Sequence, residues 1–161
     1  GGIFGSDITV NSQRVATAEN FASVFLQYAD GSAFNFGSLS YYGYQFSNVE
    51  SQNNTGNRVF TVDNGNRSKI TINRTGFFSI HFTGKESGGN WIGIFRNDDG
   101  SFASNENSLL CSMAITDGPA HCSWAGYLQS GDVISGQTTT DWNSTAPLYV
   151  TLSIQSYYLE P

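Results

Sequence analysis

From residue 41 onward, apolar and polar side chains alternate with the two-residue period of a β-strand. The clearest example is the segment 76–83, in which Phe78, Ile80 and Phe82 share one face. Turn residues, above all Gly, Asn and Asp, separate the alternating segments. The expected strands cover residues 41–49, 58–62, 69–73, 76–83, 91–96, 108–115, 120–128, 132–139 and 148–158. Strands this short and closely spaced, without helices between them, predict an all-β antiparallel sandwich or jelly roll.

The first 40 residues follow a different pattern. Residues 1–18 are small and polar, and residues 29–40 have the composition of a loop. Between them, four apolar residues recur at the i, i+3, i+4, i+7 spacing of a helix face, namely Phe21, Val24, Phe25 and Tyr28. This spacing predicts a short helix over residues 19–28, with a strand as the alternative. We therefore expect a neck or shaft-end segment over residues 1–40 and a jelly-roll head domain over residues 41–161.

The two cysteines test the register of the strands expected at 108–115 and 120–128. If the turn 116–119 closes a hairpin, Cys111 lies opposite Cys122. The same register places four further apolar residues on the face of the cysteines, namely Leu109, Met113, Ala120 and Trp124. This agreement between pleat and polarity supports the hairpin. Because directly opposed cysteines on neighbouring strands make strained bridges, we expect two buried thiols, with a disulfide as the alternative.

Length and charge narrow the range of partners. The chain has 161 residues, which fits one domain, and only 12% of them are charged, with a net charge of −6. Phosphate binding needs clustered Lys and Arg, and the seven basic residues are scattered, so we expect no nucleic-acid partner. No apolar run approaches the roughly 18 residues of a membrane-spanning helix, so we expect no membrane insertion.

The sequence carries little that suggests catalysis. Its two histidines, His81 and His121, belong to no recognisable catalytic motif, and His81 is expected to be a hydrogen-bonded structural residue. Asp98, Asp99 and Glu106 surround a predicted turn, which explains them, with a surface calcium site as the alternative. We expect a binding protein rather than an enzyme, with no cofactor.

Aromatic residues in polar loops are a different signal. They lie among Asn, Asp, Ser and Gly, a setting suited to stacking on a sugar ring while the amides bond its hydroxyls. The candidate binding residues are Trp142 with its neighbours Asp141 and Asn143, the cluster Tyr41, Tyr42 and Tyr44, and Trp91. The alternative is that these rings pack into the core or into a subunit interface.

Some aromatic residues fall on strand faces opposite the expected core. These residues are Phe77, Phe95, Tyr127 and Tyr149. A solitary sandwich should be polar on its outer faces, so a second apolar surface predicts an interface around a symmetry axis.

Four segments resemble the tumour-necrosis-factor and complement-globular-head superfamily. They are residues 69–82, with a Gly before an aromatic-rich strand, residues 91–96, residues 124–134, with a Leu-x-x-Gly-Asp step, and residues 148–158. The order and spacing of these segments carry the resemblance, which covers about residues 58–158. It implies a ten-stranded jelly roll that assembles as a homotrimer and engages receptors through surface loops.

The segment 5–17 looks like the repetitive shaft ends of phage tail fibres. This likeness favours a phage or viral fibre head at the virion surface, attaching to a host cell-surface glycan or protein. The alternative is a secreted cytokine-like or complement-like trimeric ligand that binds a protein receptor. A glycan-degrading fibre fragment is a minor alternative.

Overall fold

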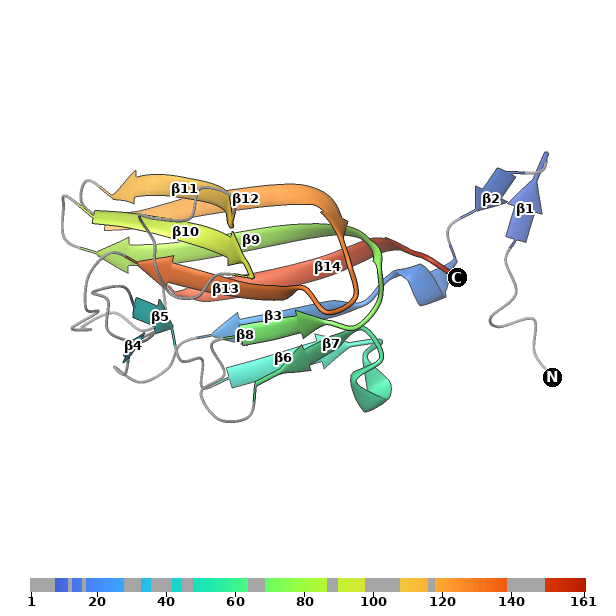
Figure 1. The fold of residues 1–161 in the computed structure, drawn as a ribbon, viewed down its shortest axis with the longest axis horizontal. Helices are drawn as coiled ribbons and strands as arrows, with labels where there is room; N and C mark the ends of the chain where they lie inside the picture. The colour runs from blue at the N-terminus through green and yellow to red at the C-terminus, as the bar shows by residue number, and fades with distance from the viewer. Residues whose placement is uncertain are drawn as a thin grey trace.

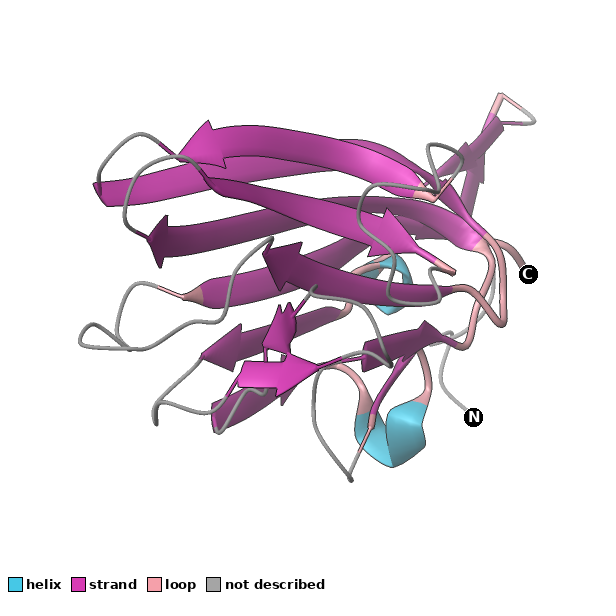
Figure 2. Cartoon of the chain, turned by 60° about the vertical axis from the view of Figure 1, so that its left-hand side comes forward, coloured by secondary structure: helices cyan, strands magenta, loops and turns pink. Residues whose placement is uncertain are grey.

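The computed structural model shows two β-sheets packed face to face, with two single-turn helices at their margin (Figures 1 and 2). It describes residues 8–11, 13–15, 17–27, 33–35, 42–44, 48–63, 69–86, 90–97, 108–115, 118–138 and 150–161. The strands are β1 (Ile8–Val10), β2 (Gln13–Val15), β3 (Ser23–Gln27), β4 (Ala33–Asn35), β5 (Tyr42–Tyr44), β6 (Asn48–Gln52), β7 (Phe60–Val62), β8 (Lys69–Ile72), β9 (Gly76–Glu86), β10 (Asn90–Arg96), β11 (Leu109–Ile115), β12 (Gly118–Leu128), β13 (Val133–Thr138) and β14 (Thr151–Leu159). The 3₁₀ turns are η1 (Ala18–Asn20) and η2 (Thr55–Asn57).

One sheet has five strands in the order β12-β9-β14-β3-β6, and all of its neighbours are antiparallel. Its long strands β9 and β12 pair without interruption. The ladder runs from Gly76 opposite Leu128 to Glu86 opposite Gly118. The other sheet has seven shorter strands, with the path β11-β10-β13-β5-β4 and with β8 and β7 joined to it through β13. Two antiparallel sheets with these crossovers confirm the expected jelly-roll sandwich.

The core lies between the sheets and follows the predicted alternation. Phe78, Ile80 and Phe82 of β9 are fully buried. The ring of Phe78 meets Phe60 of β7 edge-on, with centroids 5.9 Å apart, and so links the two sheets. Gly136 of β13 faces Phe82, because a Cβ at position 136 would lie 2.9 Å from its ring.

The tight turn between β12 and β13 explains the Leu-x-x-Gly-Asp step. Gly131 has a φ of +98°, which favours glycine. The Asp132 carboxylate accepts hydrogen bonds from the Gln129 amide at 2.8 Å and from the Asn97 side chain at 2.7 Å. These contacts reverse the chain and send it from one sheet to the other.

The helix expected at residues 19–28 is wrong. A single 3₁₀ turn at Ala18–Asn20 precedes strand β3, in which Val24 and Leu26 are buried and Phe25 is exposed. The helical spacing arose because Phe21 and Phe25 lie on the outer side of the sheet while Val24 faces the core. A strand with apolar residues on both faces imitates helical periodicity.

Strand β3 also changes the expected division at residue 40. It pairs with β14 on one side and with β6 on the other, inside the five-stranded sheet. The head therefore includes residues before 41. The separate two-stranded sheet β1–β2 precedes it along the chain.

The predicted hairpin between 108–115 and 120–128 is also wrong. Cys111 of β11 is aligned with Ile94 of β10, and Cys122 of β12 is aligned with Phe82 of β9, in the other sheet. The two cysteines form a disulfide across the sandwich, with Cα atoms 6.1 Å apart, and do not remain free thiols. Of the residues expected on the face of the cysteines, Ala120 and Trp124 pack against the core. Met113 is 46% exposed, and Leu109 lies on the side of Gly93 and Phe95.

Candidate functional site

Most of the loop residues predicted to bind lie outside the described residues. This holds for Tyr41, for Asp141, Trp142 and Asn143, and for the calcium candidates Asp98 and Asp99 together with Glu106. The three others are placed by the seven-stranded sheet. Tyr42 and Tyr44 belong to β5, and Trp91 belongs to β10.

Strand pairing brings two of these segments to one end of the seven-stranded sheet. Thr138, the last residue of β13, is aligned with Ile92 of β10 on one side and with Tyr42 of β5 on the other. Trp91 precedes Ile92, and its side chain is 47% exposed. We call this end of the sheet, marked by Trp91, Tyr42 and Thr138, the loop end. Strand β13 ends here, and Trp142, four residues later in the sequence, lies outside the described residues.

A second candidate surface is the side of the five-stranded sheet that faces away from the core. We call it the outer face. Its exposed aromatic residues lie on or beside four segments of the sheet, and each exposes about two fifths or more of its surface. They are Phe21 (41%), Phe25 (38%), Phe77 (40%), Tyr127 (47%) and Tyr157 (41%). The rings of Phe21 and Tyr157 meet edge-on with centroids 6.4 Å apart. Sequence reasoning found Phe77 and Tyr127 but missed the other three, because Phe21 and Phe25 were assigned to a helix.

The middle of the outer face is small and polar. Strand alignment gives its cross-strand rows, such as Ser123–His81–Ser153–Phe25–Glu50. Among the described residues on this face, Glu50 on the edge strand β6 is the one carboxylate within the strand rows. Beyond the rows, Glu160 accepts a hydrogen bond from the Tyr127 hydroxyl at 2.7 Å.

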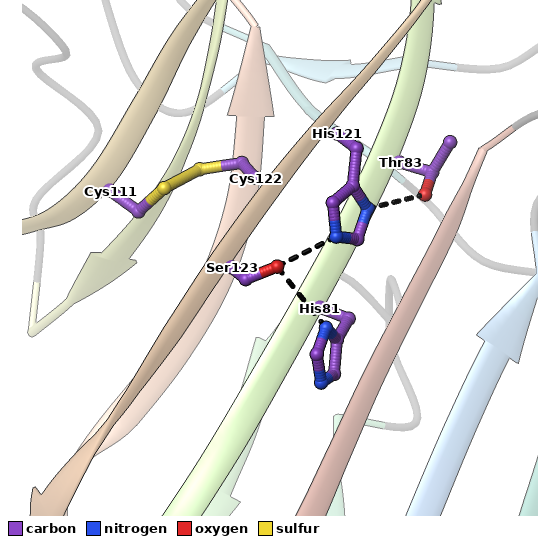
Figure 3. Close-up of a disulfide and its surroundings, with 6 residues drawn as sticks. All are labelled: His81, Thr83, Cys111, His121, Cys122 and Ser123. Carbon is purple, nitrogen blue, oxygen red and sulfur yellow. Dashed lines mark hydrogen bonds between the residues drawn. A yellow bond between two sulfur atoms is a disulfide. The ribbon is translucent and has the colours of Figure 1, made fainter.

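Both histidines lie together on this face (Figure 3). The rings of His81 on β9 and His121 on β12 stack with centroids 5.7 Å apart and an angle of 18° between their planes. Ser123 Oγ lies between them, 3.2 Å from His81 Nδ1 and 2.6 Å from His121 Nε2. The other nitrogen of His121, Nδ1, lies 3.2 Å from Thr83 Oγ1. The sequence predicted hydrogen bonds for His81, but not the pairing of the two rings.

Two further aromatic residues were expected on outward faces. Phe95 lies opposite the core side of β10, since a Cβ at Gly93 would be 2.8 Å from its ring, but it is fully buried. It therefore offers no surface to a partner. Tyr149 lies outside the described residues.

The described part of the chain lacks two features, a membrane-spanning helix and a metal-binding cluster. It contains no helix that is long and apolar enough to cross a membrane. It also contains no group of three or more His, Cys, Asp and Glu residues placed to hold a metal ion.

Comparison with known proteins identifies the fold but not a family. No family profile matches this sequence, and no curated protein sequence matches it. Among solved structures, murine APRIL at pH 5.0 is similar, with a TM-score of 0.56 and 13% identity over 84% of this chain and 98% of that chain. GITRL from bushbaby has a TM-score of 0.56 and 8% identity over 86% and 96%. Rabbit GITRL has a TM-score of 0.52 and 9% identity over 83% and 91%. The sandwich is therefore a jelly roll like that of tumour-necrosis-factor ligands.

Proposed function

We propose that this chain is an extracellular binding protein that assembles as a homotrimer through the outer face and engages a protein receptor through the loop end. One observation carries the proposal, namely the outer face with its five exposed aromatic residues and few charges. Exposed apolar surface of this extent is typical of an interface. A homo-oligomer is a suitable partner, because two copies of an acidic chain can meet here without bringing many carboxylates together.

The similar structures favour the secreted-ligand alternative over the phage or viral fibre head. The similarity to APRIL and GITRL supports a cytokine-like fold. The disulfide between Cys111 and Cys122 is consistent with an oxidising, extracellular setting. The proposed role is binding, with no catalytic step and no cofactor.

The assembly is tested by one substitution made on each sheet. Phe77 on the outer face is 40% exposed and Trp91 at the loop end is 47% exposed, so the two sites are matched in accessibility. Phe77→Asp should convert the trimer to monomer, because it would bury an unpaired carboxylate at the interface. Trp91→Asp should leave the trimer intact. Sedimentation velocity at micromolar concentration measures both, and a wild-type monomer would refute the proposed assembly.

Receptor binding is tested on cells with the intact trimer. Trp91→Ala should reduce binding at least about tenfold, since an exposed aromatic anchor at an interface contributes on the order of 1.4 kcal/mol or more. Treating the cells with protease should abolish binding, whereas removing surface glycans should leave it unchanged. If glycan removal abolishes binding and protease treatment does not, the hypothesis of glycan binding is favoured.

A further inference from the structure

The starting point is the hydrogen-bond network around the two stacked histidines. Both imidazoles can be neutral within it. His81 Nδ1–H can donate to Ser123 Oγ, the serine hydroxyl to His121 Nε2, and His121 Nδ1–H to Thr83 Oγ1. The three hydrogen bonds of the neutral pair therefore need no acidic partner.

Among the described residues of the surrounding strands, no carboxylate lies beside the pair to stabilise its protonated form. On β9 and β12 the neighbouring outward residues are Ser79, Thr83, Ser123 and Ala125, and on β14 Ser153 is aligned with His81. Phe25 follows on β3. In the rows described, the carboxylate nearest along this face is Glu50 on β6, three strands away from β9. On β9 itself, the ionisable residues Lys85 and Glu86 follow toward the end of the strand, where they are aligned with Pro119 and Gly118.

The free-energy cost of protonating the two histidines depends on their exposure to water. In the single chain both histidines are exposed, so water solvates their charge. A second copy that covers the outer face removes this water without supplying a carboxylate from the described rows. Two like charges with ring centroids 5.7 Å apart then repel in a medium of lower dielectric constant. Threefold symmetry repeats this arrangement in every subunit.

We propose that His81 and His121 make the association of copies of this chain depend on pH, so that the assembly forms near neutral pH and dissociates in mild acid. The proposal rests on the self-association described under the proposed function. The assembled state binds fewer protons than the separate chains, and linkage then requires that association weakens as pH falls. The role of this pH dependence would be to release the trimer in an acidified compartment.

The experiment compares the association constant at pH 7.5 and pH 5.5 by sedimentation velocity. For the wild type it should fall at least about 100-fold, which corresponds to exclusion of about one proton per trimer on average over these two pH units. The double variant His81→Gln/His121→Gln keeps polar side chains that cannot titrate, and it should change less than about threefold over the same range. Near-UV circular dichroism at both pH values confirms that every sample remains folded.

The outcomes separate the two proposals. A wild type that is monomeric at pH 7.5 overturns the self-association and, with it, the pH dependence. A wild type that is equally trimeric at both pH values overturns the pH dependence alone. The pH dependence proposed for the histidines is also overturned if the double variant loses association in acid as the wild type does. If the double variant does not fold, the single variant His121→Gln, at an exposed site, should show a pH dependence intermediate between the two.

Discussion

The two sheets of this sandwich differ most in what they do with aromatic residues on their outward sides. In the seven-stranded sheet, Phe95 points away from the core, yet it is completely buried against Gly93 and its surroundings. In the five-stranded sheet, Phe25, Phe77 and Tyr127 also point away from the core, and each remains about two fifths exposed. The seven-stranded sheet covers Phe95 within the chain but leaves Trp91, on the same side of β10, 47% exposed at the loop end. The five-stranded sheet leaves a broad aromatic face open.

The strand lengths give a physical reason for this difference. In the five-stranded sheet, β9, β12 and β14 have 11, 11 and 9 residues and form nearly continuous ladders. In the seven-stranded sheet, β4, β5 and β7 have three residues each, and the ladder between β10 and β11 shifts register at Phe95. Irregular strands bend and let a side chain fold back on its own sheet, whereas a long regular ladder presents its side chains to a flat partner.

The largest expected effect contrasts the core side and the outer face of the single strand β9. Phe82 and Phe77 both belong to β9, and the first is fully buried while the second is 40% exposed. Phe82→Ala should lower the free energy of unfolding by about 3–5 kcal/mol, because it removes a buried ring and leaves a cavity. Phe77→Ala should cost the isolated chain less than about 1 kcal/mol. Urea denaturation at low protein concentration measures both, and equal losses would contradict the assignment of the two faces.

The next effect concerns the covalent link between the sheets. Removing the Cys111–Cys122 disulfide should lower the free energy of unfolding by about 3 kcal/mol, the value expected for a closed loop of about a dozen residues. The double variant Cys111→Ala/Cys122→Ala and the reduced wild type should have similarly lowered melting temperatures. A melting temperature that does not respond to reductant would show that the thiols are free in solution.

The smallest effect compares two serines of β14. Ser156 is fully buried, and its hydroxyl accepts a hydrogen bond from the Ala22 amide at 2.8 Å. Ser156→Ala should lower the free energy of unfolding by about 1–3 kcal/mol, because the buried amide loses its acceptor. Ser153→Ala, on the outer face, should change it by less than about 0.5 kcal/mol. If both variants unfold at the same urea concentration as the wild type, Ser156 has no such structural role.

Strand alternation in the sequence was enough to predict the fold class and the core side of β9. It was not enough at β3 and at the cysteines, and both failures have one cause. Periodicity records which residues share a face, but not what covers that face. Phe21 and Phe25 mimic a helix because the outer face of their sheet is apolar. Cys111 and Cys122 fitted a hairpin register because residues on two facing sheets can reach the same core as residues on paired strands do.

Only part of the candidate site could be found from the sequence. Phe77 and Tyr127 were predicted to form a second apolar surface, since each lies opposite a core residue on a clearly alternating strand. The stacking of His81 on His121, which are 40 residues apart in the sequence, depends on the alignment of β9 with β12. No local pattern encodes an alignment over that distance, so the pair was seen as two separate residues. The loop residues Trp142, Asn143 and Asp141 stay a prediction.

The hydrogen bond from the Leu159 amide to the Asn20 side chain, at 2.8 Å, joins the place where the chain enters the five-stranded sheet to the place where it leaves. Entry and exit are therefore neighbours, and a short linker could connect Pro161 to Thr17 without disturbing either sheet. Such a circular permutant, opened between β10 and β11, should keep the sandwich. The same geometry would let the domain be inserted into a surface loop of a host protein, where it would display the loop end of its seven-stranded sheet.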